Sequence, residues 1–387
     1  MNLQTEKIEN TPVFVVDTAL LRKNLERLKM VKDASGVKIL LALKGFAMHG
    51  VAPLIMEYLD GVAASSLNEA CLGAEFFKKE VHVYTPAFLD HELEQIVNSA
   101  DHFVFNSLNQ FRTQAPKMRA IASRIGKKIQ IGLRVNHGYS EVKVMLYNPC
   151  APGSRFGVWW EDLAKLNEQE WENIDGLHFH TMCQQGSDVL QRSIAVIHKR
   201  VGNYLHKCRF INFGGGHHIT RPDYDTDLLI KILKDFRKDF DGDVYLEPGE
   251  AIALNTGFLV SSVVDLTYNA GDIAILDTSA TAHMPDVIEM PYRPEIIGAA
   301  LPGEKPYTYK LGGLTCLAGD VIGDYSFDQP LKIGDRLVFT DMAHYTMVKT
   351  TQFNGVNLPD IAVIEDKTRN FKVVRSFSYD DYKKMLS

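Results

Sequence analysis

Short apolar runs alternate with amphipathic segments along the first part of the chain. Segments such as LNEACLGAEFFKK (67–79) and HELEQIVNSA (91–100) carry apolar residues at helical spacing. Continuous apolar strands that alternate with helices favour a parallel sheet covered by helices. Eight units of this kind predict an α/β fold with a closed (β/α)8 barrel of the TIM type, and an open doubly wound sheet is the alternative. The predicted strands are residues 37–43, 60–65, 81–85, 102–106, 128–136, 174–181, 209–215 and 243–248.

The pattern changes after about residue 260. Short β-rich segments, among them FLVSSVVDLTY (258–268) and DRLVFTD (335–341), are separated by Gly, Pro and Asp turns. They predict a second, mostly antiparallel β domain, either a barrel or a sandwich. The strand PVFVVD (12–17) has no helix before it, so we assign it to the same domain. The predicted domains are therefore a barrel over 18–260 and a β domain built from 1–17 and 261–387.

Composition narrows the class of protein. Hydrophobic residues make up 45% and charged residues 23% of the 387 residues, as in soluble globular proteins. The net charge of -6 and the absence of a basic block argue against nucleic-acid binding. No apolar stretch is long enough to cross a bilayer, and the polar N-terminus is not a signal peptide. Five scattered cysteines without a Cys-x-x-Cys pair predict a reducing, cytoplasmic location and no metal site.

A lysine stands at the end of the first barrel strand, in LLALKGFA (40–47). One interpretation makes Lys44 the first solvated residue after a buried strand, since apolar runs often end in a charge. The other interpretation is an amine whose pKa is lowered by desolvation and which forms a Schiff base. The stretch alone does not decide between the two interpretations.

Other chemically competent residues also follow strands. Active sites of (β/α)8 barrels lie where the strands end, so these groups are expected on one face. An amine, an imidazole, a glycine turn and a carboxylate form the set that pyridoxal phosphate needs: an imine, a ring to stack on the cofactor, a phosphate cradle and a partner for the pyridine nitrogen. Each group alone also has an ordinary structural interpretation. The residues are His178, His180, Cys183, Gly214, Gly215, Gly216, Glu247 and Glu250.

Nearly the whole chain resembles the fold type III pyridoxal-phosphate decarboxylases, which act on ornithine, diaminopimelate or arginine. The resemblance is carried by motifs in family order: PVFVVD, ALKGF, ASSLNEA with Glu69, GLRVN, SRFG, GGG, EPGE, CLAGD, MAHYT and TQFNG. It implies that Lys44 carries the cofactor and that Cys316 protonates the α-carbon. His180, Gly214, Gly215, Gly216, Glu247 and Tyr345 would contact the cofactor. It also implies a homodimer with shared active sites.

The chain departs from the common pattern of this family at two places. EPGE has Glu250 where relatives have an arginine, and the segment after His180 lacks their phosphate-binding serine. These features, with CLAGDVIGD and TAHMPDVIEMPYRP, are similar to the carboxynorspermidine and carboxyspermidine decarboxylases. The resemblance implies a substrate with an amino-acid head and a cationic polyamine tail. Glu250, Asp286 and Asp320 are the candidate carboxylates for that tail.

Four other functions stay open on the sequence. Diaminopimelate or ornithine decarboxylation would make the EPGE change incidental. An alanine-racemase-like enzyme shares the barrel but would need a second general base, commonly a tyrosine. A non-catalytic pyridoxal-phosphate carrier would be a single barrel. A phosphate-binding barrel enzyme without the cofactor would show no imine absorbance.

Overall fold

The computed structural model describes residue 5 and residues 8–387, which form two compact units. The barrel unit is Lys23–Ile252, and the β unit consists of the described residues up to Arg22 together with Ala253–Ser387. The sequence placed the divisions after residues 17 and 260, so 18–22 and 253–260 lie in the β unit instead. The predicted contribution of residues 1–4, 6 and 7 to the β domain lies outside the described residues.

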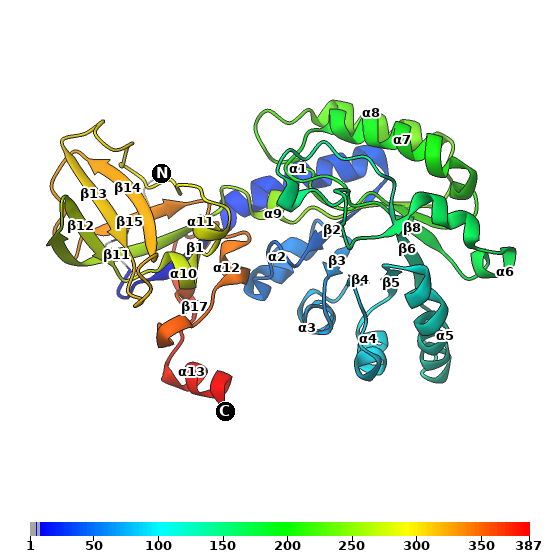
Figure 1. Ribbon diagram of the computed structural model, residues 1–387, viewed down its shortest axis with the longest axis horizontal. Helices are drawn as coiled ribbons and strands as arrows, with labels where there is room; N and C mark the ends of the chain where they lie inside the picture. Colours follow the sequence, from blue (N-terminus) through cyan, green and yellow to red (C-terminus); the bar gives the residue numbers. More distant parts are fainter. Residues whose placement is uncertain (1–4, 6–7) are drawn as a thin grey trace. The chain divides into compact units, whose positions relative to one another are not determined.

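The barrel unit is a closed ring of eight parallel strands, as predicted (Figure 1). The order around the ring is β5-β4-β3-β2-β10-β9-β8-β6, and pairing of β5 with β6 closes it. Every predicted run overlaps one strand, which confirms the fold class. The strands are β2 (Lys38–Ala42), β3 (Gly61–Ala64), β4 (Glu80–Tyr84), β5 (His102–Phe105), β6 (Gln130–Asn136), β8 (Gly176–His178), β9 (Phe210–Asn212) and β10 (Asp243–Leu246), with the short β7 (Val158–Trp159) beside β6.

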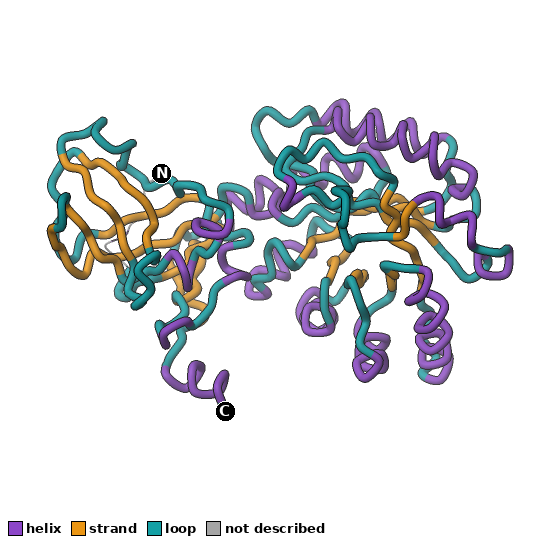
Figure 2. Tube along the Cα trace, viewed as in Figure 1, coloured by secondary structure: helices purple, strands orange, loops and turns teal. Residues whose placement is uncertain are grey.

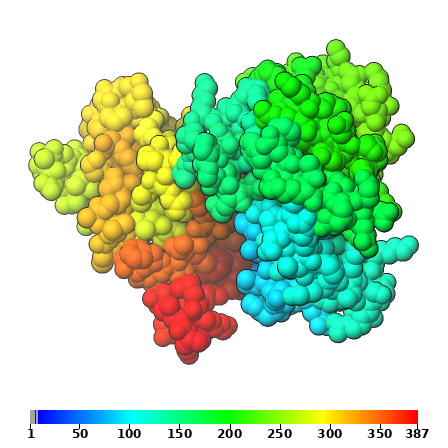
Figure 3. Space-filling view, turned by 45° about the vertical axis from the view of Figure 1, so that its right-hand side comes forward, coloured from blue at the N-terminus to red at the C-terminus, as the bar shows by residue number. Residues whose placement is uncertain are grey.

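Helices follow most strands and cover the barrel. In Figure 1, α3–α5 lie on one side of the strands and α7 and α8 on another, and Figure 3 shows them as separate parts of the surface. Ser66 and Ser107 cap α3 and α5, because each hydroxyl accepts the backbone N–H three residues on. The helices are α1 (Thr18–Ser35), α2 (Ala52–Met56), α3 (Leu67–Leu72), α4 (Leu93–Ser99), α5 (Leu108–Arg124), α6 (Glu168–Trp171), α7 (Ser187–Leu205), α8 (Thr226–Lys238) and α9 (Glu250–Ala253).

The β unit is built around one mixed, mostly antiparallel sheet (Figure 2). Its order is β14-β13-β12-β11-β1-β16-β17, and β15 pairs with β11. The N-terminal strand β1 lies between β11 and β16, so both ends of the chain form this sheet. The strands are β1 (Val13–Asp17), β11 (Gly257–Tyr268), β12 (Asp272–Leu276), β13 (Tyr307–Gly312), β14 (Val321–Phe327), β15 (Arg336–Thr340), β16 (Asp360–Ile364) and β17 (Phe371–Arg375).

Short helices complete the β unit, and those within residues 280–289 and 346–349 pack on its buried core, whereas the last helix has no buried residue. That core includes Phe14, Leu259, Leu311, Tyr325 and Phe339, each at most 2% exposed. Alternating strand positions supply it, so one face of the sheet is dry. The helices are α10 (Ala280–His283), α11 (Asp286–Glu289), α12 (Thr346–Lys349) and α13 (Tyr379–Leu386).

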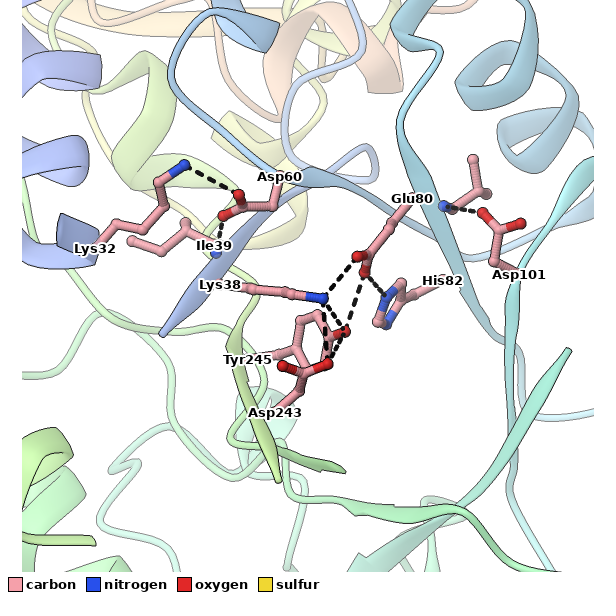
Figure 4. A network of polar contacts seen from close by, with 10 residues as sticks. Lys32, Lys38, Ile39, Asp60, Glu80, His82, Asp101, Asp243 and Tyr245 are labelled. Atoms are coloured by element: carbon pink, nitrogen blue, oxygen red, sulfur yellow. Dashed lines mark hydrogen bonds and ion pairs between the residues drawn. The ribbon is translucent and has the colours of Figure 1, made fainter. Parts of the chain in front are cut away.

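A polar cluster fills the barrel at the N-terminal ends of its strands (Figure 4). Lys38 donates to Glu80 at 2.8 Å, to Asp243 at 3.2 Å and to the Tyr245 hydroxyl at 3.1 Å. The rings of His82 and His102 stack with centroids 3.7 Å apart. The Lys38, Glu80 and Asp243 side chains are partly buried, and these contacts pair their charges at the end of the barrel opposite the strand carboxyl ends.

The same cluster brings Glu80, His82 and His102 close enough to resemble a metal site. The two imidazoles are nearly parallel, so their in-plane lone pairs do not converge on one point. The Lys38 ammonium already supplies the cation beside Glu80. We therefore regard the cluster as structural.

Two further features of the described residues bear on the sequence predictions. No helix among them has both the length and the apolar character that a membrane span requires. The five cysteines are free thiols, and Cys316 is the exposed one among them.

Candidate active site

Lys44 lies two residues beyond β2, at the carboxyl end of that strand. Solvent reaches part of this residue, while protein atoms and several charged groups surround its amine. Burial among protein atoms and the Arg134 cation lower the pKa of the Lys44 amine, while Glu247, Cys183 and Glu69 oppose that shift. An accessible amine with a lowered pKa is suited to nucleophilic chemistry.

Two glycines bring the Lys44 turn against the turn that follows β10. A Cβ atom on Gly45 would lie 3.0 Å from the Gly249 Cα, and one on Gly249 would lie 3.3 Å from the Ala42 carbonyl oxygen. The Ala42 N–H donates to the Pro248 carbonyl at 3.0 Å. The glycines of ALKGF and EPGE therefore hold the lysine and the two glutamates of EPGE close together.

Glu247 is ionised at the end of β10. Its two oxygens accept from His178 Nε2 at 3.0 Å and from Asn212 Nδ2 at 2.6 Å. Burial alone would raise the pKa of this carboxyl, but His178 and the Asn212 amide hold it down at about 2. A buried carboxylate of this kind can hold a proton on a ring nitrogen.

The glycine turn after β9 is packed tightly. A Cβ atom on Gly214 would lie 2.7 Å from the His180 Cβ, and one on Gly215 would lie 2.5 Å from the Glu247 carbonyl oxygen. The Gly214 N–H donates to Asn212 Oδ1, and the Gly215 N–H donates to His180 Nδ1. A phosphate would thus depend on the N–H groups from Gly216 onward, a narrower cradle than three glycines imply.

His180 is fixed in one tautomer at the same end of the barrel. Its Nδ1 accepts from Gly215 at 2.7 Å, so the proton is on Nε2. Burial, together with the Lys44 and Arg134 charges, lowers the pKa of His180 well below its usual value, so the ring is neutral. A neutral, oriented imidazole is suited to stacking on an aromatic ring.

Glu250 has partners from two neighbouring turns. Gln184 Nε2 donates to its carboxylate at 2.7 Å, and His218 Nε2 lies 3.3 Å from the same oxygen. Burial and the Glu250 charge raise the pKa of Cys183, whereas Lys44 lowers it, so Cys183 is within electrostatic reach of both. Glu250 therefore belongs to the same group of charged residues as Lys44 and Cys183.

Four of the predicted site residues lie in the β unit, namely Asp286, Cys316, Asp320 and Tyr345. Cys316 is exposed, and its N–H donates to Asn354 Oδ1 at 2.7 Å. Tyr345 has φ 51° and ψ -47°, a conformation that costs a bulky residue about 1–3 kcal/mol. Such strain is typical of functional positions. Asp286 is bound by Lys349, which also binds Glu289.

Asp320, the fourth predicted residue in the β unit, is 5% exposed. Its carboxylate accepts hydrogen bonds from its own unit, including one from Ser279 at 2.9 Å. This environment differs from the substrate contact that the sequence predicts for it.

The barrel thus gathers Lys44, His180, the glycine turn, Glu247 and Glu250. The sequence-based list of site residues omitted Arg134, which lies inside the quoted motif GLRVN. Arg134 is 5% exposed, donates to the His180 carbonyl at 3.0 Å and lies 4.5 Å from the centroid of the Tyr84 ring. The signal in the sequence that could have identified Arg134 is a charged residue within an otherwise apolar strand.

Comparison with known proteins places this geometry in a family. Residues 13–343 match the family described as pyridoxal-dependent decarboxylase, C-terminal sheet domain. The chain belongs to this family. Decarboxylase relatives of similar length confirm the resemblance on which the sequence interpretation depended.

Three relatives match this chain over almost the whole length of both proteins. A carboxynorspermidine/carboxyspermidine decarboxylase of Campylobacter jejuni is 43% identical over 97% of this chain and 98% of its own. A carboxyaminopropylagmatine decarboxylase of Synechocystis is 43% identical over 97% and 95%. A second carboxynorspermidine/carboxyspermidine decarboxylase, from Herminiimonas arsenicoxydans, is 38% identical over 98% and 100%.

Solved structures agree with these relatives. The crystal structure of the Campylobacter jejuni carboxynorspermidine decarboxylase complexed with norspermidine superposes with a TM-score of 0.88 at 41% identity, over 97% of this chain and 100% of that chain. A diaminopimelate decarboxylase from Helicobacter pylori, complexed with L-lysine, reaches 0.80 at 17% identity, over 99% and 98%. The second likeness shows the fold alone.

The residues at the barrel's strand ends fit the cofactor of this family. An accessible amine of lowered pKa, an ionised buried carboxylate and a neutral imidazole are the groups its ring requires. His217, at the end of the glycine turn, is 1% exposed, and both its ring nitrogens are buried without a hydrogen-bond partner among the described residues. Such atoms normally have partners, so they are compatible with an acceptor group nearby.

Proposed function

We propose that this protein is a pyridoxal-phosphate-dependent carboxy-lyase that decarboxylates carboxynorspermidine, carboxyspermidine or both, and so forms norspermidine or spermidine. The observation that carries the proposal is Glu250, a carboxylate held beside the candidate active site at the position where the resemblance to the wider family predicts an arginine. The three relatives with 38–43% identity support the same class of substrate.

The barrel residues would act on the amino-acid head. Pyridoxal phosphate, when bound, supplies an electron sink for the electron pair that remains as CO2 leaves. Lys44 would hold it covalently, and Glu247 would keep a proton on its ring nitrogen. His180 would stack on its ring, and Gly214, Gly215 and Gly216 would shape the turn near its phosphate. Tyr345 would be a further contact of the phosphate, as the family resemblance implies. Hydrogen bonds from His178 and Asn212 keep Glu247 ionised and fixed for this task.

The β unit would supply the acid that completes the reaction. Cys316 would donate a proton at the α-carbon, which requires an accessible thiol, and its residue is exposed. We propose that the chain forms a homodimer in which Cys316 enters the site of the partner subunit. Free cysteines and the absence of a membrane-spanning helix among the described residues are consistent with work in the cytoplasm.

The cationic tail would be bound chiefly by Glu250. The Gln184 amide, which is uncharged, donates to its carboxylate at 2.7 Å, and His218 Nε2 lies 3.3 Å from the same oxygen. Asp286 is less available than the sequence predicts, because the Lys349 ammonium is shared between it and Glu289. We therefore assign the main electrostatic contribution to Glu250 and a secondary one to Asp286.

Carboxyaminopropylagmatine is a second candidate substrate. The carboxyaminopropylagmatine decarboxylase is as similar to this chain, at 43% identity, as the Campylobacter jejuni enzyme. Its substrate name indicates a guanidinium-bearing tail, which also requires carboxylates. Glu250 alone does not distinguish an ammonium from a guanidinium.

A product assay on a panel of substrates tests the proposal. The panel contains carboxynorspermidine, carboxyspermidine, carboxyaminopropylagmatine, diaminopimelate, ornithine and arginine, each compared by kcat/KM. We expect a carboxylated polyamine to be preferred. The kcat/KM values for the two polyamine lengths should differ by no more than about 10- to 200-fold, since one methylene is worth about 1–3 kcal/mol. Preference for diaminopimelate or ornithine would refute the assignment.

Glu250→Gln is expected to lower kcat/KM for the preferred polyamine substrate by about 10- to 150-fold. This range corresponds to the loss of a charge-assisted hydrogen bond of about 1.5–3 kcal/mol. The dissociation constant of pyridoxal phosphate, measured by absorbance titration, should barely change. If the variant instead loses the cofactor while its substrate affinity holds, diaminopimelate decarboxylation becomes the better assignment.

Asp286→Asn serves as the matched comparison in the β unit. We expect a smaller rise in KM than for Glu250→Gln, because Lys349 already neutralises much of the Asp286 charge. The measurement is steady-state kinetics of both variants with the same substrate. A larger effect for Asp286→Asn would make the β unit, and not the barrel, the main site of tail recognition.

A further inference from the structure

Asp320 is saturated by donors from its own unit. Oδ1 accepts from the Ser279 hydroxyl at 3.0 Å and from the Thr281 N–H at 3.2 Å. Oδ2 accepts from the Thr315 N–H at 3.1 Å, the Thr315 hydroxyl at 2.7 Å and the Ser279 hydroxyl at 2.9 Å. A Cβ atom on Gly313 would lie 2.4 Å from Oδ2, so the backbone is packed directly on the carboxylate. This buried group has no free side from which to bind a substrate amine.

The hydrogen bonds of Asp320 fix the cysteine loop, which we define as residues 313–320. Thr315 immediately precedes Cys316, and Gly313 N–H donates to the Asp320 carbonyl at 3.0 Å. The Asp320 N–H in turn donates to the Leu317 carbonyl at 2.9 Å. Residues 314 and 316–319 are exposed, so without these bonds little else would fix the loop.

Asn354 provides a second, independent tether. Its Oδ1 accepts the Cys316 N–H at 2.7 Å. Asn354 has φ 57°, in the left-handed region that few residues other than Gly, Asn and Asp adopt readily. The asparagine thus combines the required backbone conformation with an acceptor directed at the cysteine.

The two tethers belong to one framework. Ser279 and Thr281, which bind Asp320, stand at the start of α10. At the end of that helix, His283 Nε2 lies 3.0 Å from the Asn357 carbonyl, and the Thr351 N–H donates to the Ala282 carbonyl at 2.7 Å. The helix therefore connects the Asp320 side of the loop to the segment that carries Asn354.

We propose that Asp320 and Asn354 are positioning residues that hold the Cys316 thiol in one orientation for proton delivery. This role replaces the substrate contact predicted for Asp320, and it rests on the proposed function. A proton donor on an exposed loop is effective only when its atom is placed accurately, since a misplacement of about 1 Å can cost about 10²-fold in rate.

A double-mutant cycle tests the role in catalysis. Asp320→Asn keeps the size but offers an amide to donors, so we expect kcat to fall about 10²-fold with KM and cofactor affinity nearly unchanged. In a Cys316→Ala background the same change should cost almost nothing further, because the misplaced thiol is already absent. A raised KM would show that Asp320 binds the substrate. Full additivity with Cys316→Ala would show that Asp320 acts through general stability and not through the cysteine.

Two variants of Asn354 separate the effect of its side-chain acceptor from the effect of its backbone conformation. Asn354→Gly tolerates the positive φ but removes the acceptor, whereas Asn354→Asp keeps both. We expect a loss of kcat for the glycine variant and near-normal kcat for the aspartate variant. The matched control is Asp324→Asn. Asp324 lies on β14 and pairs at the surface with Lys310 on β13, so this change should leave kcat unchanged. Equal losses for both Asn354 variants would exclude the tether.

Hydrogen exchange decides the tether independently of any substrate. In the full-length holoenzyme, Asp320→Asn should speed exchange of the Thr315 and Thr281 amides, and Asn354→Gly should speed that of Cys316. Unchanged exchange at these amides would overturn the positioning role even if the enzyme is active. Faster exchange with no decarboxylation of any panel substrate would instead uphold the tether and refute the proposed function.

Discussion

Lys44→Ala is expected to reduce decarboxylation to near background and to remove the absorbance band of lysine-bound pyridoxal. Desolvation by the surrounding protein atoms and the Arg134 cation lower the pKa of the amine, while Glu247, Cys183 and Glu69 oppose that shift. The covalent attachment supplies the electron-sink chemistry, which the remaining side chains cannot replace. Absorbance spectra with and without borohydride, together with turnover, provide the measurement.

The matched control is Lys29→Ala, on the exposed side of α1, where the lysine pairs with Asp33. It should keep both the absorbance band and normal turnover, because surface ion pairs contribute little. A Lys44→Ala protein that retains the band and full turnover would show that another lysine holds the cofactor. The interpretation of Lys44 as the first solvated residue of a turn would then be sufficient.

The barrel could be predicted because its strands are buried on both faces. Such strands read as continuous apolar runs, and all eight were found in this way. Their ends were less accurate: β8 and β9 have three residues each, shorter than the predicted runs 174–181 and 209–215. In both runs the chain leaves the ladder after the strand and continues into the segments that carry His180 and the glycine turn.

The site was less predictable, because partners far apart in the sequence determine what a side chain can do. Asp286 reads as a free acid in HMPDVIEMP, but Lys349 binds it across 63 positions. The sequence makes Asp320 a candidate carboxylate for the cationic tail, but Ser279 and Thr281 donate hydrogen bonds to it within the β unit. Such pairings depend on the fold of the β unit, which short strands and turns leave undetermined in the sequence.

The glycine turn shows the same limit within the barrel. Three consecutive glycines predict a cradle of N–H groups, yet steric contact with His180 and Glu247 accounts for Gly214 and Gly215. Their N–H groups are already donated within the protein. The sequence correctly located the turn beside the site, whereas the structure changes the reason for its glycines.

Cys316→Ala is expected to keep pyridoxal phosphate bound and to lower kcat by about 10²- to 10⁴-fold, the usual contribution of a general acid. The thiol lies on an exposed loop of the β unit, away from the fold's core, so the fold and the cofactor site should survive its removal. Cys71→Ala, which changes a half-buried cysteine on α3, is the matched control and should be fully active. Steady-state kinetics and the absorbance spectrum provide the measurements.

Mixing two inactive chains tests whether the sites are shared. If Cys316 enters the partner's site, a heterodimer of Lys44→Ala and Cys316→Ala chains contains one site with both intact residues and one with neither. Random exchange makes about half of the dimers mixed, so about a quarter of the wild-type activity should return. A mixture of Lys44→Ala with Glu247→Gln should not recover, because both changes lie on the barrel and each site takes its barrel from one chain. Absence of recovery in the first mixture, with subunit exchange demonstrated by mass-tagged chains, would mean that Cys316 does not act in the partner's site.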